Sequence, residues 1–320
     1  MDPVRNNKQS QRCFGFESLN SENKKKENKS RMKYPEKIDL HMHSTASDGT
    51  DSPEELIEKV KAAGIELFAV TDHDGIDGAN KTGQLLLERK ETELQFIKGI
   101  EFSCRDEFGK YHILGYAYDS ETEELKNVVS VAHNNRVEKV QKRLDFLKEE
   151  FGFTFKDEDI KDLFKNANPG KPHIANMMIR YGYAASIQGA MKDYLNKKKF
   201  PNAYIRPEVA IQTILKSKGV PVLAHPIYGD GSQMILGDEL KDRIERLIDF
   251  GLEGLEGYYS GFTPKMISLV TQHAKNYQLY VTAGSDYHGN NKLVQLLDTN
   301  LEKTSSGCPE LFRFLDRVLV

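Results

Sequence analysis

Short apolar, β-branched segments recur along this chain, and a histidine or a carboxylate follows each of them within a few residues. Runs at 65–70, 96–97, 220–224 and 279–283 precede His73, Glu101, His225 and Asp286. Residues at the C-terminal ends of strands that alternate with helices converge at the mouth of an α/β barrel. We therefore expect polar side chains from distant parts of the chain to meet in one site.

The segment His41-Met42-His43 indicates the chemistry of that site. It follows a strand-like start at 37–40, and the period-2 alternation of a strand puts both imidazoles on one side of the backbone. Two neutral imidazoles that face the same way have few partners other than a cation. Six imidazoles and three carboxylates in such motifs are candidate metal ligands: His41, His43, Asp48, His73, Glu101, His112, His225, Asp286 and His288.

Taken alone, any one of these candidates, such as His112, is best interpreted as an ordinary polar residue near a turn. As a set of nine, they are not expected to follow apolar runs by accident. One tetrahedral ion needs about four ligands and a six-coordinate ion about six. Nine ligands with a bridging carboxylate therefore predict two or three divalent ions close together.

In chain order the motifs are H-x-H, S-D-G, T-D-H, G-I-E, H-I-L-G-Y, A-H-P and G-S-D-x-H. This set resembles the PHP (polymerase and histidinol phosphatase) family of metal-dependent phosphoesterases, and within it the branch of nucleotide phosphatases and 5′-to-3′ exoribonucleases. The resemblance implies an α/β fold, namely a distorted (β/α)7 TIM-like barrel with a helical insertion domain. It also implies a trinuclear metal centre.

The resemblance further implies how the nine ligands divide among three ions. His41, His43, Glu101 and Asp286 would hold the first ion, Glu101, His112 and His225 the second, and Asp48, His73 and His288 the third. Glu101 would bridge two ions, and Glu101, Asp286 and His225 are predicted to carry catalysis. Mn²⁺ is the first choice of metal, with Zn²⁺ or Fe²⁺ as alternatives, because imidazole and carboxylate ligands suit all three.

Length and composition allow one barrel with an insertion. A chain of 320 residues with 38% hydrophobic content can bury a large core, and a barrel of this kind takes roughly 250 residues. We expect the barrel at 37–150 and 207–320, because the strand–helix alternation gives way to helical, turn-rich sequence at 151–206. That segment is predicted to be a helical insertion that caps the substrate.

Residues 1–36 are predicted to form a disordered basic arm, because the first 37 residues carry ten Lys and Arg against five Asp and Glu and few apolar residues. Without these 37 residues the chain has 35 of its 45 basic and 43 of its 48 acidic residues, a net charge of −8. An acidic body argues against a broad duplex-binding surface. A phosphorylated substrate must then be attracted by the metal ions and a few local basic groups.

A helix predicted at 123–148 supplies candidate substrate contacts. It carries Arg136, Lys139 and Arg143 on one face at spacings of three and four, a pattern that is usually a solvent-facing stripe. The resemblance implies a phosphate-contacting arginine in this helix, at a stretch that matches Asn134-Asn135-Arg136. We therefore predict that Arg136 binds substrate, with Asn135 beside it. Lys139 and Arg143 are weaker candidates for substrate binding.

A second candidate contact lies at the start of a short helix, in Gly170-Lys171-Pro172-His173. A helix N-terminus flanked by Lys171 and His173 suits an anion. A capped helix whose histidine merely packs explains the spacing equally well, and the resemblance favours substrate contact. The related motif most often has Arg where this chain has Lys171, and an ammonium does not make the two parallel hydrogen bonds of a guanidinium.

Further short motifs predict a helix start, a supporting carboxylate and residues outside the site. Ser52, Pro53 and Glu55 predict a capping box at the start of a helix that ends before Gly64. In the glycine-rich strand at 251–257, Glu256 is expected to support a ligand. His133 and His273 are expected to pack or to lie on the surface, and the Lys197-Lys198-Lys199 run is expected in a solvated loop.

The cysteines and the hydropathy of the chain indicate the cellular compartment of the protein. Cys13, Cys104 and Cys308 have no paired spacing, so neither a disulfide framework nor a zinc knuckle is expected, and Cys104 is expected to pack behind the site. There is no run of about 18 apolar residues and no apolar signal core at the start. These features predict a cytoplasmic protein without a membrane anchor.

The chain has no Walker A sequence, Gly-x-Ser-x-Gly elbow or dinucleotide fingerprint. The function implied by the resemblance is hydrolysis of nucleotide phosphomonoesters by a metal-activated hydroxide, with a nucleoside 3′,5′-bisphosphate or the 5′ end of a short RNA as substrate. The alternatives are a phosphatase of another small phosphomonoester, such as histidinol phosphate, and a non-catalytic metal-binding module. The insertion favours a nucleotide, and the complete ligand set favours catalysis. The oligomeric state stays open.

Overall fold

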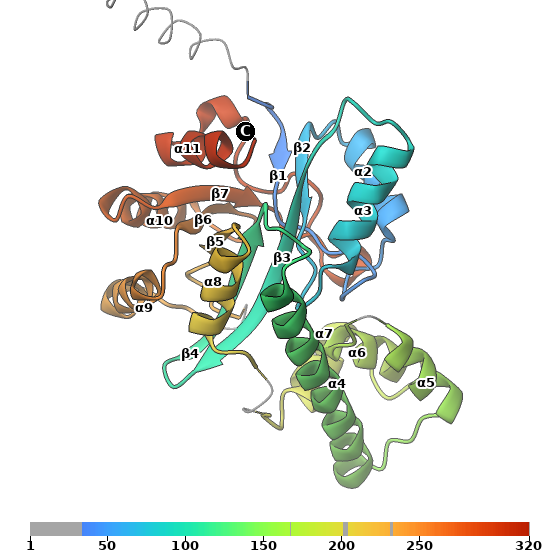
Figure 1. Ribbon diagram of the computed structural model, residues 1–320. Coiled ribbons are helices and arrows are strands. Elements are labelled where there is room, and N and C mark those ends of the chain that lie inside the picture. The colour runs from blue at the N-terminus through green and yellow to red at the C-terminus, as the bar shows by residue number, and fades with distance from the viewer. Residues whose placement is uncertain (1–33, 167, 201–203, 231–232, 320) are drawn as a thin grey trace, which may run out of the picture. The chain divides into compact units, whose positions relative to one another are not determined.

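Seven strands of the chain form one sheet, with helices around it (Figure 1). The computed structural model describes residues 34–166, 168–200, 204–230 and 233–319. The predicted basic arm therefore falls almost entirely outside the described residues. The strands are β1 (Ile38–Asp39), β2 (Leu67–Val70), β3 (Gln95–Asp106), β4 (Gly109–Tyr116), β5 (Val220–Leu223), β6 (Gly254–Tyr259) and β7 (Tyr280–Gly284).

Helices in the described part of the chain follow most of the strands. They are α2 (Pro53–Ala62), α3 (Asp77–Glu88), α4 (Glu123–Phe151), α5 (Asp157–Lys165), α6 (Lys171–Arg180), α7 (Ile187–Ala190), α8 (Pro207–Lys216), α9 (Gly237–Asp249), α10 (Pro264–Asn276) and α11 (Pro309–Val318). A π-helical turn, η1 (Met191–Leu195), and two 3₁₀ turns, η2 (Gly289–Asn291) and η3 (Thr304–Ser306), complete the elements. None of the described helices is both long and apolar enough to serve as a membrane span.

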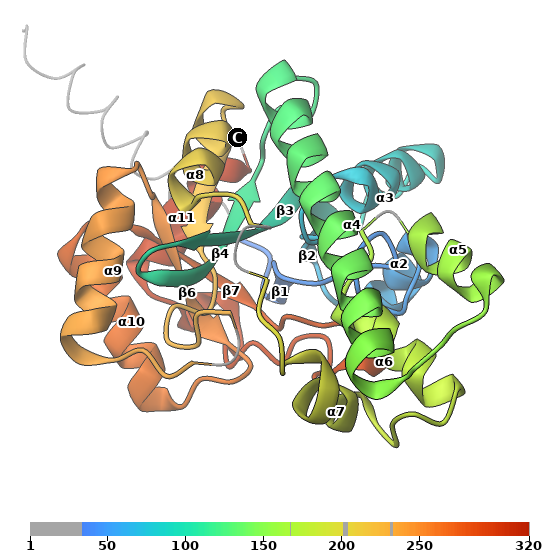
Figure 2. The same cartoon turned by 90° about the horizontal axis from the view of Figure 1, so that it is seen from below.

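The sheet runs in the order β1 to β7 and nearly closes into a barrel, seen from below in Figure 2. Beyond β1, the Leu40 N–H donates to the carbonyl of Ala283 (2.9 Å), and the Asp286 N–H donates to the carbonyl of His41 (2.8 Å). Strands β2 and β5 are buried along their whole length, which explains why they are continuous apolar runs in the sequence. The predicted distorted (β/α)7 barrel is confirmed.

The regular alternation breaks at β3 and β4, which form a hairpin with no helix between them. Strand β4 is antiparallel to both β3 and β5, whereas the other neighbouring pairs are parallel. The prediction that every candidate ligand follows a strand is therefore wrong for Glu101 and His112, which lie inside β3 and β4. In this ladder His112 is opposite Ser103, two residues from Glu101, so the side chains of Glu101 and His112 share one face.

Helix α2 begins where the sequence predicted. The Ser52 side chain accepts a hydrogen bond from the Glu55 N–H (3.2 Å), and the Glu55 side chain accepts one from the Ser52 N–H (2.8 Å). Leu56, Ile57 and Val60 pack from α2 into a core cluster with Phe68 and Val70 of β2. This packing holds the loop between β1 and α2, which carries His43 and Asp48, at the rim of the barrel.

Helices α5, α6 and α7 pack together with the second half of α4, below the barrel in Figure 1. Helix α4 is continuous from 123 to 151 and ends at Gly152, which has a left-handed φ of 68°. Its buried Val140, Leu144 and Leu147 join Ile174 and Met178 of α6 in one apolar cluster. The long helix therefore links this cluster to the barrel, and the domain boundary expected at 150–151 stays a prediction.

Candidate active site

Glu101 lies at the centre of a buried group of imidazoles. Its Oε2 is 3.2 Å from His43 Nε2 and 3.1 Å from His73 Nδ1. Its Oε1 is 2.9 Å from His112 Nδ1 and 3.3 Å from His225 Nε2. Oε2 is also 3.4 Å from His41 Nε2, so five imidazoles from four segments of the chain meet one carboxylate.

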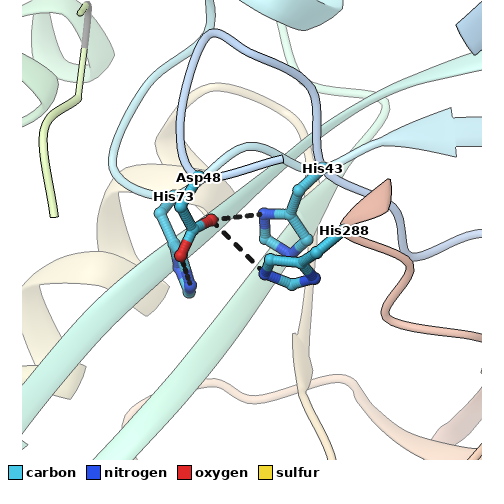
Figure 3. Close-up of side chains that lie close together, drawn as sticks. All are labelled: His43, Asp48, His73 and His288. Carbon is cyan, nitrogen blue, oxygen red and sulfur yellow. Dashed lines mark ion pairs between the residues drawn. The ribbon is translucent and has the colours of Figure 1, made fainter. Parts of the chain in front are cut away.

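Asp48 and Asp286 flank this centre. Asp286 Oδ1 is 3.5 Å from His41 Nε2 and 3.4 Å from His43 Nε2. Asp48 Oδ1 is 3.3 Å from His288 Nε2, and Figure 3 shows Asp48 between His43, His73 and His288. The structure thus brings together all nine side chains that the sequence singled out as candidate ligands.

Ligand atoms that lie within 4.8 Å of one another form three groups: His41, His43, Glu101 and Asp286; His43, Asp48, His73 and His288; and His73, Glu101 and His112. The first group equals the first set implied by the resemblance. The second adds His43 to the implied set, and the third has His73 where the resemblance implied His225. The division among ions stays a prediction.

The donor atoms fit a divalent cation. His41 Nε2, His43 Nε2, His73 Nδ1, His112 Nδ1 and Glu101 Oε2 are buried and have no hydrogen-bond partner among the described atoms. Buried polar atoms are nearly always hydrogen-bonded. Here short nitrogen–oxygen distances occur without hydrogen-bond geometry, as expected for ligands that point at a shared ion. Imidazole and carboxylate donors together suit Mn²⁺, Fe²⁺ or Zn²⁺.

The carboxylates of the site are held in their ionised form. Burial alone would raise the pKa of Glu101, but His112, His73 and His41 hold it well below its usual range. Burial likewise opposes ionisation of Asp286, yet Lys292 and the imidazoles of His41 and His288 hold its pKa well below the ordinary value. Burial lowers the pKa of His73 well below its ordinary value, whereas the neighbouring carboxylates outweigh burial at His41 and His43, raising the pKa of His41 well above its ordinary value and that of His43 to about 9. Because metals bind neutral imidazoles, an ion bound here would displace protons from these rings.

Two contacts orient the imidazoles of His41 and His288. His41 Nδ1 donates to Glu256 Oε1 (2.8 Å), and Glu256 Oε2 accepts from the His225 N–H (2.8 Å). His288 Nδ1 donates to the Asp286 carbonyl (2.8 Å). Each bond leaves Nε2 facing the carboxylates, which is the usual way in which a metal-binding histidine is oriented. Glu256 supports a candidate ligand, as the sequence suggested.

Asp72 and Asp39 hold the loops of the site, and the sequence analysis missed both. Asp72 accepts hydrogen bonds from the Ser44 N–H (2.8 Å), the Ser44 hydroxyl (2.7 Å) and the Ser47 hydroxyl (2.6 Å). Asp39 accepts from the Ser285 N–H (2.9 Å), and burial raises its pKa to about 6. The available signal was adjacency, since each aspartate lies within two residues of a candidate ligand.

Tyr259 and Lys292 were also missed. The Tyr259 hydroxyl (3.0 Å) and the Lys292 ammonium (2.5 Å) both donate to Asp286 Oδ2. They leave Oδ1 facing His41 and His43. Both residues therefore orient this carboxylate, and no spacing in the sequence connects Tyr259 to it.

A cavity of about 540 Å³ opens from the nine-residue cluster toward the helical insertion. Asp48, His73 and His112 line the cluster end. The rest of the cavity has a wall of basic side chains from β3, β4, α4 and the insertion, with Asp230 as an acidic residue among them: Arg105, Lys110, Arg136, Lys139, Arg143, Lys171, Lys198 and Lys199. A volume of this size lies within the range of small-molecule sites.

Arg136 is buried, and so are Lys139 and Arg143, with exposed fractions of 8%, 9% and 4%. The stripe therefore does not face solvent, which is the usual arrangement for such a pattern, because the insertion covers this face of α4. Arg136 donates from Nε (3.0 Å) and Nη2 (2.5 Å) to Asp74 Oδ2, and from Nη2 to the Ser103 hydroxyl (3.0 Å). Asp74 is thus a further residue of the site that sequence reasoning missed, although it directly follows His73.

The other predicted substrate contacts lie at different places. Lys171 lines the cavity and donates to Asn196 Oδ1 (2.7 Å). His173 Nδ1 accepts from the Gly170 N–H (3.1 Å), and burial lowers its pKa. Neither His173 nor Asn135 is among the described residues that line the cavity, and Asn135 is half-buried on α4. Lys198 and Lys199 are exposed, as expected, and border the cavity.

The remaining histidines and Cys104 lie outside the cluster. His133 Nδ1 is 3.3 Å from Asn168 Oδ1, and the His273 ring stacks near Tyr277. Cys104 is buried beside the cavity, and burial raises the pKa of its thiol well above the ordinary value. A protonated thiol is neither a nucleophile nor a metal ligand, which agrees with the expected packing role.

The PHP domain family model matches residues 39–260. The 5′-3′ exoribonuclease of Haemophilus influenzae is 28% identical and covers 79% of this chain and 90% of its own length. The phosphoribosyl 1,2-cyclic phosphate 1,2-diphosphodiesterase of Eggerthella lenta is 29% identical (78% and 94%), and the 3′,5′-nucleoside bisphosphate phosphatase of Chromobacterium violaceum is 27% identical (78% and 87%).

A solved structure from Bifidobacterium adolescentis, assigned as a metal-dependent phosphoesterase, superposes with a TM-score of 0.73 at 25% identity and covers 88% of this chain and 97% of its own. The family match spans more than half of the chain and includes seven of the nine candidate ligands. The chain therefore belongs to the PHP domain family of metal-dependent phosphoesterases.

Proposed function

We propose that this chain hydrolyses a phosphomonoester of a nucleotide, either a nucleoside 3′,5′-bisphosphate or the 5′ end of a short RNA. One observation carries the proposal: a single cavity joins the cluster of nine ligand-type side chains to a wall of basic side chains, of which Arg136, Lys139 and Arg143 are buried. Metal ions held by the cluster would bind the phosphoryl group that reacts. The basic side chains of the wall would bind the further negative charge that nucleotides carry. The relatives named for nucleotide and RNA substrates agree with it.

The nine residues are proposed to hold two or three divalent ions, with Mn²⁺ as the first choice and Zn²⁺ or Fe²⁺ as alternatives. Glu101 is proposed to bridge two of these ions, and the contacts of its two oxygens with different imidazoles support this role. Asp286 and His225 are proposed to complete the catalytic group. Bound ions would supply an activated water and neutralise charge on the phosphoryl oxygens.

Arg136 is proposed to orient the reacting phosphate. Asp74 accepts hydrogen bonds from the Nε and Nη2 groups of Arg136, and no described residue accepts one from Nη1. A Cβ at Gly170 would lie 3.3 Å from this Nη1, so the glycine leaves room beside the guanidinium. His173, on the same turn as Gly170, is proposed as a neutral donor, because its Nδ1 accepts from the backbone and its proton therefore sits on Nε2.

The test is phosphate release by metal-stripped protein supplied with Mn²⁺, Zn²⁺ or Fe²⁺. The substrates are a nucleoside 3′,5′-bisphosphate, a 5′-phosphorylated short RNA, a phosphoribosyl 1,2-cyclic phosphate and histidinol phosphate. We expect the highest kcat/KM on one of the first two substrates. The proposal is wrong if histidinol phosphate or the cyclic phosphate is preferred, or if no nucleotide releases phosphate with any of the three metals.

Mn²⁺ should also stabilise the stripped protein, because it would bind only the folded arrangement of the ligands. At a free concentration of 100 times Kd, one ion adds about 2.7 kcal/mol of unfolding free energy. Differential scanning fluorimetry should therefore show a rise in Tm of several degrees, at roughly 2 to 4 °C per kcal/mol. Mg²⁺, which prefers oxygen ligands, serves as the comparison ion. An unchanged Tm with Mn²⁺, Zn²⁺ and Fe²⁺ alike would contradict metal binding at this cluster.

A further inference from the structure

Three basic side chains line the cavity on the side away from the nine-residue cluster. Lys139 and Arg143 lie four positions apart on one face of α4, and Lys171 is the first residue of α6. Lys139 and Arg143 are more than nine-tenths buried. Long charged side chains are rarely buried to this degree unless a partner compensates their charge.

The positive charges of Arg143 and Lys171 lack the carboxylate partner that Arg136 has. Arg136 has the carboxylate of Asp74, whereas no carboxylate of the described residues forms an ion pair with Arg143 or Lys171. Lys171 donates to the neutral amide of Asn196, and the Nε of Arg143 is buried without a hydrogen-bond partner among the described atoms. Asp230, the carboxylate on this side of the cavity lining, pairs with Lys110. The cavity wall therefore holds buried positive charge and one guanidinium donor that no described atom accepts.

Aromatic rings occupy the sides of this cation group. The Lys139 ammonium lies 3.8 Å from the centroid of Tyr204, and the Arg143 guanidinium lies 5.1 Å from the centroid of Phe200. Both rings line the cavity, but cations already lie over them. Stacking of a nucleobase on these rings is therefore disfavoured, and the chemistry that remains is that of an anion site.

The cations also repel one another. Burial, Arg136 and Arg143 lower the pKa of Lys139 well below its ordinary value, and burial and Arg143 lower the pKa of Lys171 to about 8. Burial lowers the pKa of Arg143 to about 10, with Arg136 adding to the shift. A negative group among the three would relieve this repulsion, because an opposite charge favours each protonated form.

We propose that Lys139, Arg143 and Lys171 form a second anion-binding subsite, which holds a phosphate of the substrate other than the one that is hydrolysed. This inference rests on the proposed nucleotide phosphoesterase function. Arg136 and Arg143 are two helical turns apart on α4, about 10 Å along its axis, so the two arginines serve different groups. The second phosphate comes either from a bisphosphate or from the next phosphodiester of an RNA, and the same oxyanion chemistry recognises both.

The test compares substrates with one and two phosphates on purified protein loaded with Mn²⁺. The two-phosphate substrates are a nucleoside 3′,5′-bisphosphate and a 5′-phosphorylated dinucleotide, and the one-phosphate substrates are the nucleoside 3′- and 5′-monophosphates. The variants are Arg143→Gln and Lys171→Gln. Lys142→Gln is the matched control, because Lys142 is exposed on α4 and pairs with Glu138.

Each variant should raise KM for a two-phosphate substrate about tenfold, as expected for a lost charge-assisted contact. The ratio of kcat/KM between two-phosphate and one-phosphate substrates should fall by a similar factor, and Lys142→Gln should leave it within about twofold. Arg143→Lys should restore part of the ratio. A response of the dinucleotide alone, or of the bisphosphate alone, supports the subsite and identifies its source.

Equal losses on one-phosphate and two-phosphate substrates, or no loss on either, overturn the subsite. If Arg143→Gln does not fold, as judged by its Tm, Lys171→Gln decides alone, because the Lys171 ammonium donates to the neutral amide of Asn196 and forms no salt bridge with a described residue. The two proposals fail in different ways. Without phosphate release from any nucleotide by the wild type, the proposed function fails, whereas an active wild type with an unchanged ratio in the variants refutes only the subsite.

Discussion

Replacing Glu101 with glutamine is expected to lower turnover on every phosphate ester by about two to three orders of magnitude or more. The carboxylate contacts five imidazoles, and its two oxygens face different members of the group. Glutamine has nearly the same shape but carries no charge and offers one acceptor oxygen in place of two. It could not bridge two cations as a carboxylate would, so ions held by this cluster, and the nucleophile they would supply, should be lost together.

Steady-state kinetics and metal analysis of the same preparations make this test. Glu101→Gln should hold fewer ions per chain than the wild type, while its circular dichroism stays native. Glu93→Gln is the control, because Glu93 is an exposed carboxylate just before β3. Wild-type activity together with wild-type metal content in Glu101→Gln would exclude the bridging role.

Replacing Arg136 with alanine should affect both binding and stability. Loss of a charge-assisted phosphate contact should raise KM for nucleotide substrates about ten- to a hundredfold. The same change leaves Asp74 buried without its ionic partner, and breaking a buried pair costs about 3 to 5 kcal/mol of unfolding free energy. Some loss of kcat is also expected, since a phosphate grip positions the reacting phosphorus. Kinetics and urea unfolding measure the two effects separately.

The double variant Asp74→Ala, Arg136→Ala separates these two roles. It removes both charges, so it should recover much of the unfolding free energy lost in Arg136→Ala. KM for nucleotide substrates should stay as high as in Arg136→Ala. Arg136→Lys keeps the positive charge without the guanidinium and should lie between the wild type and the alanine variant. If the double variant also recovers KM, Arg136 acts only as the structural partner of Asp74.

Local sequence patterns predicted much of the barrel. Buried strands such as β2 and β5 are uninterrupted apolar runs, and the capping box at Ser52 marks the start of α2. The motifs with histidine and carboxylate residues include every member of the cluster around Glu101. These features depend on residues close together in the chain, where backbone preferences and the period of apolar residues act directly.

The spacing of basic residues on α4 could not decide whether their stripe faces solvent or a site. Spacing shows that Arg136, Lys139 and Arg143 share a face of the helix, but it does not show what packs on that face. The insertion buries all three, and Asp74, 62 residues away, pairs with Arg136. Glu101 and His112 were likewise expected after strands, because nothing in the sequence marked β3 and β4 as a hairpin whose interior residues reach the site.

The sequence by itself determined the chemistry of this protein: which side chains could bind metals, in which order, and on what class of barrel. Tertiary structure alone decided how the ligand atoms group around Glu101, how Glu256 and Lys292 orient them, and which cations line the cavity. The reason is that ligand identity is a property of single residues and short motifs. Grouping, orientation and burial are set by contacts between residues far apart in the chain, and these exist only once the sheet has closed and the insertion has packed against α4.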